Sequence, residues 1–260
     1  MIMSQLAAAI AARNVPKGSL AIYWLCQAGF VFKSSDGRIV YIDPYLTDAV
    51  ERVVGFKRMM SSPIAPAEVV ADLVICTHEH LDHMDTDALP VIAQNPRTHF
   101  AGPTECFKYF EDLRIPPERC HLLQEGQSVV MGDLTIKGVY ADHGDLSPCA
   151  LGVVLDFDGI RVYHTGDTAY RPEQFRPAIE TRPDILLPCI NGAFGNMDAR
   201  EAAQLAQLTA PSLVFPTHFW LFVEQNGNPK HFLELCSQLA PGVAAPLLKP
   251  GEEYLFQKAI

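Results

Sequence analysis

Residues 72–85 constrain the fold of this chain more than any other stretch. Four apolar residues, 73–76, have the character of a buried strand, and they run directly into His78, His80, Asp82 and His83. Packing alone does not select so many metal-ligating side chains in six positions. In an extended segment the first three of these ligands share one side, and the turn after Asp82 brings His83 to the same pocket. The stretch predicts a metal site at the end of a buried strand.

The kinds of ligand in this cluster indicate the metal and the type of site. Imidazole and carboxylate ligands together suit zinc, manganese or iron. The cluster contains no cysteine, which argues against a closed structural zinc site. A strand before the cluster and a helix after it make an incidental group of surface histidines a poor explanation. We therefore expect an open, catalytic metal site.

Three further ligand-type residues directly follow predicted strands. His143 follows the strand at 134–140, Asp167 follows the strand at 160–164, and His218 follows the strand at 213–215. Loops at the rim of a sheet commonly carry the chemistry of an enzyme. Taken singly, each residue has an ordinary alternative, because a histidine after a strand can be a hydrogen-bonded structural residue and Asp167 can be a turn residue.

Together the candidate ligands are numerous enough for two adjacent metal ions. The first ion is assigned to His78, His80 and His143. The second ion is assigned to Asp82, His83 and His218. Asp167 is assigned as a carboxylate that bridges the two cations, an arrangement that leaves room for a bridging hydroxide. Asp43, at the end of its predicted strand, is expected to accept a hydrogen bond from one of the metal-bound imidazoles.

The order of the predicted elements indicates an α/β fold. Strands are expected at 20–25, 30–33 and 38–42, and a second, strand-rich block at 120–123, 128–131, 134–140, 151–157 and 160–164. Helices are expected at 87–94, 103–113, 173–180, 198–208 and from Asn228 to a point before Pro241, and a functional loop at 46–66. We predict a four-layer αββα sandwich with the metal site at one edge of the two sheets. Residues 1–260 are expected to form one domain, with 1–18 as an N-terminal extension.

Charge and cysteine usage exclude some partners. A formal net charge of −10 disfavours nucleic acid and anionic membranes as partners, because both require a basic surface. The seven cysteines are scattered and never form a Cys-x-x-Cys pair, the pattern of reduced thiols in a cytoplasmic protein. No stretch has the length of a membrane span. We expect a cytoplasmic protein with a small-molecule substrate.

The pattern His-x-His-x-Asp-His, followed in order by His143, Asp167 and His218, resembles the motifs of the metallo-β-lactamase superfamily. Several further segments resemble the branch that contains L-ascorbate-6-phosphate lactonase: 24–29, 42–45, 102–103, 115–119, 163–167 and 190–192. The resemblance implies an αββα sandwich with a binuclear site. It also implies a cytoplasmic hydrolase that uses manganese or zinc and forms homo-oligomers.

We predict hydrolysis of a lactone or ester by a metal-bound hydroxide. Asp82 is expected to orient the hydroxide and shuttle its proton, and Asn191 to stabilise the oxyanion or contact the substrate. Lys57, Arg58 or Arg171 can meet a phosphate on the substrate, or can be ordinary surface residues. Three alternatives stay open: a two-metal phosphodiesterase acting on a small phosphodiester, oxygen chemistry at a di-iron centre, and a non-enzymatic module that binds or senses metal.

Overall fold

The computed structural model describes residues 4–258, which divide into two compact units. Unit 1 contains residues 4–122 and 248–258, and unit 2 contains residues 123–247. Each unit is built on its own mixed β-sheet, so the predicted α/β fold with two sheets is confirmed. Residues 1–3, the start of the predicted N-terminal extension, and residues 259–260 lie outside the described part of the chain.

The sheet of unit 1 has the strand order β13-β1-β2-β3-β4-β5-β6. Its strands are β1 (Ser19–Trp24), β2 (Phe30–Ser34), β3 (Ile39–Ile42), β4 (Leu73–Ile75), β5 (His99–Gly102), β6 (Cys120–Leu122) and β13 (Glu253–Gln257). Neighbours from β13 to β3 are antiparallel, and those from β3 to β6 are parallel. Every residue of β1 to β4 is buried, which explains why these strands are continuous apolar runs.

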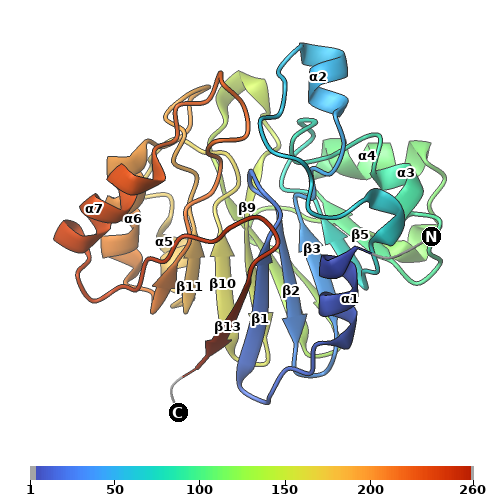
Figure 1. Cartoon of the computed structure of the whole chain (residues 1–260), viewed down its shortest axis with the longest axis horizontal. Helices are drawn as coiled ribbons and strands as arrows, with labels where there is room; N and C mark the ends of the chain where they lie inside the picture. Colours follow the sequence, from blue (N-terminus) through green and yellow to red (C-terminus); the bar gives the residue numbers. More distant parts are fainter. Residues whose placement is uncertain (1–3, 259–260) are drawn as a thin grey trace. The chain divides into compact units, whose positions relative to one another are not determined.

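The helices of unit 1 are α1 (Gln5–Ala12), α2 (Ala49–Val54), α3 (Leu89–Ile92) and α4 (Thr104–Asp112). Side chains of α1, α3 and α4 pack into one apolar cluster with alternate residues of the sheet, such as Tyr23, Tyr41 and Phe100. The ammonium group of Lys33 on β2 donates to the carbonyls of Ile10 and Ala11 at the end of α1, at 2.8 Å each. Helix α1 is therefore part of the core of unit 1 (Figure 1).

The sheet of unit 2 has the order β12-β11-β10-β9-β8-β7. Its strands are β7 (Ser128–Met131), β8 (Leu134–Tyr140), β9 (Leu151–Phe157), β10 (Ile160–His164), β11 (Ile185–Leu187) and β12 (Leu213–Val214). Strand β9 is antiparallel to both β8 and β10, and β10, β11 and β12 are parallel. Strands β8, β10, β11 and β12 consequently run in one direction, and the loops at their carboxyl ends leave from the same edge of the sheet.

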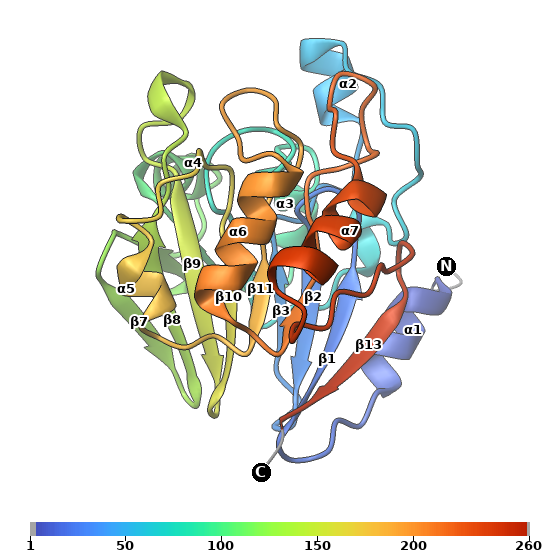
Figure 2. The ribbon, with the colours of Figure 1, turned by 90° about the vertical axis from the view of Figure 1, so that its left-hand side faces the viewer.

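The helices of unit 2 are α5 (Arg176–Ile179), α6 (Ala199–Thr209) and α7 (Pro229–Leu239). Helices α6 and α7 pack side by side (Figure 2). Asp198 and Glu201 form a capping box at the start of α6: the Asp198 carboxylate accepts from the Glu201 amide, and the Glu201 carboxylate accepts from the Asp198 amide. Short 3-10 turns lie at Pro66–Glu68, Pro117–Arg119 and Gly144–Leu146.

Several predicted elements differ from those observed. The strand near Cys120 pairs with β5 in the first sheet, so the second sheet begins only at β7. Strand β13 and helix α2 were not predicted; α2 lies inside the predicted loop 46–66. Helix α3 is shorter than 87–94, and the Asp85 carboxylate accepts from the amides of Asp87 and Ala88 just before it. Helix α5 occupies only part of 173–180.

None of the helices within residues 4–258 combines the length and the apolar character needed to cross a bilayer.

Candidate metal centre

The structure of unit 1 gathers its four predicted ligands in the turn after β4. The His78 Nε2 and His80 Nδ1 atoms are 3.0 Å apart, and the rings of His78 and His83 have centroids 4.0 Å apart. His83 Nε2 lies 3.7 Å from Asp82 Oδ2. Metal–nitrogen bonds of about 2.1 Å place two ligands of one ion at such separations. Imidazole and carboxylate donors spaced in this way fit a divalent cation, and all four belong to His and Asp groups that could hold one.

Asp43 holds His83 in one tautomer. The His83 Nδ1–H group donates to Asp43 Oδ2 at 2.8 Å, which leaves Nε2 with the lone pair that a metal requires. The same carboxylate accepts from the amide and the hydroxyl of Thr77, at 2.7 Å each. Asp43 and His83 are fully buried, so this network is shielded from water. The predicted hydrogen bond from an imidazole of the cluster to Asp43 is confirmed.

Gln27 is a further contact of the cluster that sequence reasoning missed. Its side-chain Nε2 donates to Asp82 Oδ2 at 2.8 Å. Gln27 and Cys26 both have a left-handed backbone, with φ of 50° and 77°, in the turn between β1 and β2. Non-glycine residues in this conformation cost free energy and concentrate at functional sites. The paired positive φ angles bring the Gln27 amide to a predicted ligand that is 55 positions away in the sequence.

Asp85 anchors the end of the segment that carries the four predicted ligands of unit 1. Its carboxylate accepts from the amides of Leu46 and Thr47 and from the Thr47 hydroxyl, at 2.8 Å each. It also accepts from the amides of Asp87 and Ala88 at 3.0 Å. The turn that carries the ligands is thereby tied to the segment after β3, which also supplies Asp43.

The structure of unit 2 brings its three predicted ligands together around one oxygen atom. Asp167 Oδ2 lies 3.0 Å from His218 Nε2 and 3.9 Å from His143 Nε2. The three residues follow β10, β12 and β8, whose carboxyl ends share one edge of the sheet. All three are buried, and they too belong to His and Asp groups that could hold a metal ion. The bridging role of Asp167 between two cations stays a prediction.

Asn196 was also missed. Its Nδ2 donates to Asp167 Oδ2 at 2.7 Å, and the residue is buried. Asn191, the predicted oxyanion contact, instead donates to the carbonyl of Ala193 at 3.3 Å, so its amide group shapes its own loop. Its oxyanion role stays a prediction. No local sequence signal distinguishes the two asparagines, because the contact of Asn196 depends on a loop reaching a different strand end.

The basic candidates have identifiable partners. Lys57 lies 3.9 Å from Glu51, and Arg171 pairs with Asp142 at 2.8 Å. Arg58 donates to the carbonyls of Met60 and Thr47 and lies over the ring of Tyr45. Lys57 and Arg58 line a surface cavity of about 380 Å³ in unit 1. Contact of any of these three residues with substrate stays a prediction.

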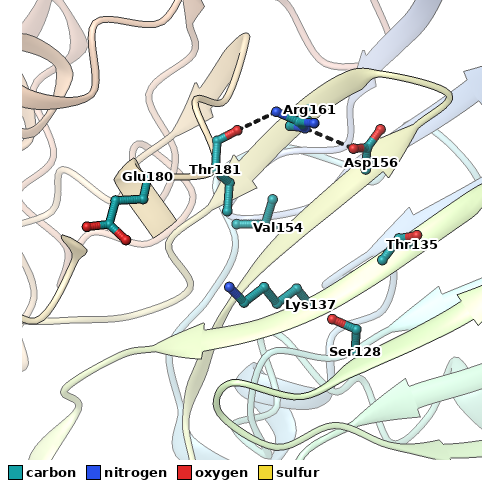
Figure 3. A pocket seen from close by; sticks show the side chains of 8 residues that line it. All are labelled: Ser128, Thr135, Lys137, Val154, Asp156, Arg161, Glu180 and Thr181. Carbon is teal, nitrogen blue, oxygen red and sulfur yellow. Dashed lines mark hydrogen bonds and ion pairs between the residues drawn. The ribbon is translucent and has the colours of Figure 1, made fainter. Parts of the chain in front are cut away.

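A second surface cavity of about 340 Å³ lies on the sheet of unit 2 (Figure 3). Thr135 and Lys137 of β8, and Val154 and Asp156 of β9, line it from one face of the sheet. Arg161 beside them donates to Asp156 and to the carbonyl of Thr181. None of the predicted metal ligands lines this cavity.

Comparison with known proteins identifies the family of this chain. A family model described as "Beta-lactamase superfamily domain" matches residues 21–218, a range that includes every candidate ligand and ends at His218. A protein of Archaeoglobus fulgidus named metal-dependent hydrolase is 29% identical over 92% of this chain and 100% of its own length. A protein of the same name from Rubrobacter xylanophilus is 30% identical over 91% and 96%. The structure of Igni18, a metallo hydrolase of Ignicoccus hospitalis, superposes with a TM-score of 0.74 at 22% identity and covers 93% of this chain and 100% of Igni18.

Proposed function

The chain belongs to the β-lactamase superfamily, and from that membership we propose that it is a metal-dependent hydrolase that opens a lactone or cleaves an ester. Two divalent cations, manganese or zinc, are proposed to be held by the seven predicted ligands: His78, His80, Asp82, His83, His143, Asp167 and His218. The segments that resemble L-ascorbate-6-phosphate lactonase support the lactone as the preferred substrate class.

The tautomer of His83 is the observation that carries this proposal. The buried Asp43 carboxylate accepts from both polar groups of Thr77 and from His83 Nδ1, which leaves His83 Nε2 available to bind a metal. A histidine whose role is only structural does not require its second nitrogen beside another carboxylate, here 3.7 Å from Asp82. This donor set favours metal chemistry over ordinary packing.

The chain's own residues have distinct tasks in the proposed reaction. Bound divalent cations would lower the pKa of a water molecule and polarise the carbonyl group of the substrate. Asp82, whose side chain is 17% exposed and held by the Gln27 amide, orients the attacking water and accepts its proton. Asp43 and Asn196 keep His83 and Asp167 in place, so the ligands need no rearrangement during the reaction.

A screen of lactones, phosphorylated sugar lactones and phosphodiesters, with manganese- and zinc-loaded protein, tests the proposal. We expect hydrolysis of a lactone or ester, loss of activity on chelation, and about two ions per chain by metal analysis. His80→Ala should be inactive, whereas His231→Ala, an exposed histidine on α7, should retain activity. Activity on phosphodiesters alone would contradict the proposed reaction and would identify the protein as a phosphodiesterase. One tightly held ion with no hydrolysis would favour a metal-sensing module.

A further inference from the structure

The loops at the ligand-bearing edge of unit 2 expose several large apolar side chains. Strands β8, β11 and β12 end at the edge where His143, Asp167 and His218 lie, and the loops that follow them leave from there. The side chains in these loops are between 47% and 74% exposed: Leu146, Phe194, Trp220 and Val223. Exposed apolar residues gathered around a site commonly mark a ligand-binding surface.

The backbone of Phe194 and of Trp220 has an energetically unfavourable conformation. Both have a left-handed conformation, with φ of 56° and 57°. Bulky side chains rarely adopt this conformation, and when they do it is usually at a functional site. Each aromatic residue is two positions from a residue at the ligand cluster: Phe194 from Asn196, and Trp220 from His218. His218 itself has φ of 63°.

The outward position of Trp220 is not the result of a loose loop. Its neighbours Phe219, Leu221 and Phe222 are buried, so the segment is anchored on both sides of Trp220. The Phe219 ring contacts the Trp220 ring edge-on, with centroids 5.5 Å apart. The Phe194 loop is closed by hydrogen bonds from the Gly192 amide to Met197 and from the Asn196 amide to Ala193, both 3.0 Å. Both aromatic side chains are therefore presented on rigid supports.

The charge of these loops indicates what they would bind. The segments 143–149, 190–198 and 216–228 contain no lysine or arginine. Arg171, a basic residue in the loop after β10, pairs with Asp142. A phosphate at this surface would lack a cationic partner in the three segments, whereas an alkyl or aryl group would be removed from water by the exposed apolar side chains.

We propose that Phe194 and Trp220 bind an alkyl or aryl group attached to the carbonyl that is hydrolysed, and so determine substrate specificity. This inference rests on the proposed function and narrows the substrate to uncharged, apolar esters or lactones. Leu146 and Val223 are exposed in the loops after β8 and β12 at the same edge of the sheet. The side chains act on the substrate directly, by burying its apolar part.

A chain-length series of p-nitrophenyl esters, from acetate to octanoate, tests the inference on metal-loaded protein. We expect kcat/KM to rise about fourfold for each methylene that becomes buried, until the surface is filled. Trp220→Ala and Phe194→Ala should flatten this dependence, so that the loss of kcat/KM is largest for the octanoate ester and smallest for the acetate ester. Leu208→Ala, which removes an exposed leucine from α6, should leave the series unaltered.

Binding is measured separately from catalysis by tryptophan fluorescence. The chain has two tryptophans: Trp24 is buried, and Trp220 is half-exposed. Butanoate, hexanoate and octanoate, which are products of the ester series, should shift the emission to shorter wavelength, and the longest acid should bind most tightly. Trp220→Phe should remove the shift, and because Trp24 remains in that variant its emission also reports whether the protein is folded.

The outcomes separate the two proposals. If no ester or lactone is hydrolysed, the proposed function fails, yet a length-dependent shift at Trp220 would still support the apolar surface. If esters are hydrolysed with no dependence on chain length and the acids cause no shift, the specificity role of Phe194 and Trp220 is overturned. It is also overturned if Trp220→Ala changes the sedimentation of the protein and leaves the ester series intact, because the surface would then join copies of the chain.

Discussion

The two units place their predicted ligands in different ways. In unit 1 the four ligands lie within six consecutive positions, and contacts from other segments, made by Asp43 and Gln27, orient two of them. In unit 2 each ligand lies in the loop after a different strand, and the three meet because their strands are parallel and end at one edge. In unit 1 the local motif brings the predicted ligands close together, and side chains from other segments orient them. In unit 2 the sheet brings the predicted ligands close together, and both histidines lie near the Asp167 carboxylate.

The largest effect is expected at that shared carboxylate. Asp167→Asn replaces the anionic oxygen that lies near His143, His218 and Asn196 with a neutral group. We expect kcat/KM to fall by more than about a hundredfold, beyond the range of substitutions that only support a ligand. Asp158→Asn, in an exposed turn of the same unit, is the matched control. Activity within a few fold of wild type would show that Asp167 is not a ligand.

In unit 1 the substitution of Asp43, which orients His83, should have a somewhat smaller effect than the substitution of a ligand. Asp43→Asn weakens the hydrogen bond that sets the His83 tautomer and disturbs both contacts to Thr77. We expect metal affinity to fall by about 10- to 100-fold, measured by titrating apoprotein with manganese or zinc. Asp48→Asn, at an exposed position before α2, provides the comparison. Unchanged affinity would mean that the local motif orients its own histidines.

The two asparagines of unit 2 give a sharper test of the comparison. Asn196→Ala removes the donor to Asp167 Oδ2, and we expect a loss of about tenfold in kcat/KM, the lower end of the range for such contacts. Asn191→Ala should have a smaller effect, because the Asn191 amide already donates to Ala193. A larger loss of kcat for Asn191→Ala, at unchanged KM, would instead assign Asn191 to the oxyanion.

The smallest expected effect concerns stability and lies away from the ligands of unit 1. Burial lowers the pKa of His99 on β5 and of His121 on β6, whose ring nitrogens are 3.0 Å apart. A histidine with a lowered pKa contributes stability that is present above its ordinary pKa of about 6.5 and is lost as pH falls towards the lowered value. We expect the melting temperature to fall between pH 7.5 and pH 5. His121→Gln should reduce that slope, and an equal slope in the variant would contradict the assignment.

Much of the fold followed from residue patterns. The strands from β7 to β10 and the capped helix α6 were predicted because alternation, turn residues and capping side chains are local signals. Strand β13 was missed because its pairing with β1 joins residues more than 200 positions apart. Cys120 was assigned to the wrong sheet for a similar reason: a short strand does not reveal which neighbour it pairs with.

The sequence by itself determined which residues are candidate ligands, because the six positions that follow one buried strand hold imidazoles and a carboxylate in an order that packing would not produce. Its strand ends also identified His143, Asp167 and His218. Only the tertiary structure decided which side chains support them. Asp43, Gln27 and Asn196 each contact a predicted ligand that is distant in the sequence. Such contacts depend on the exact approach of separate loops, and a hydrogen bond forms only within a few tenths of an ångström of its ideal distance.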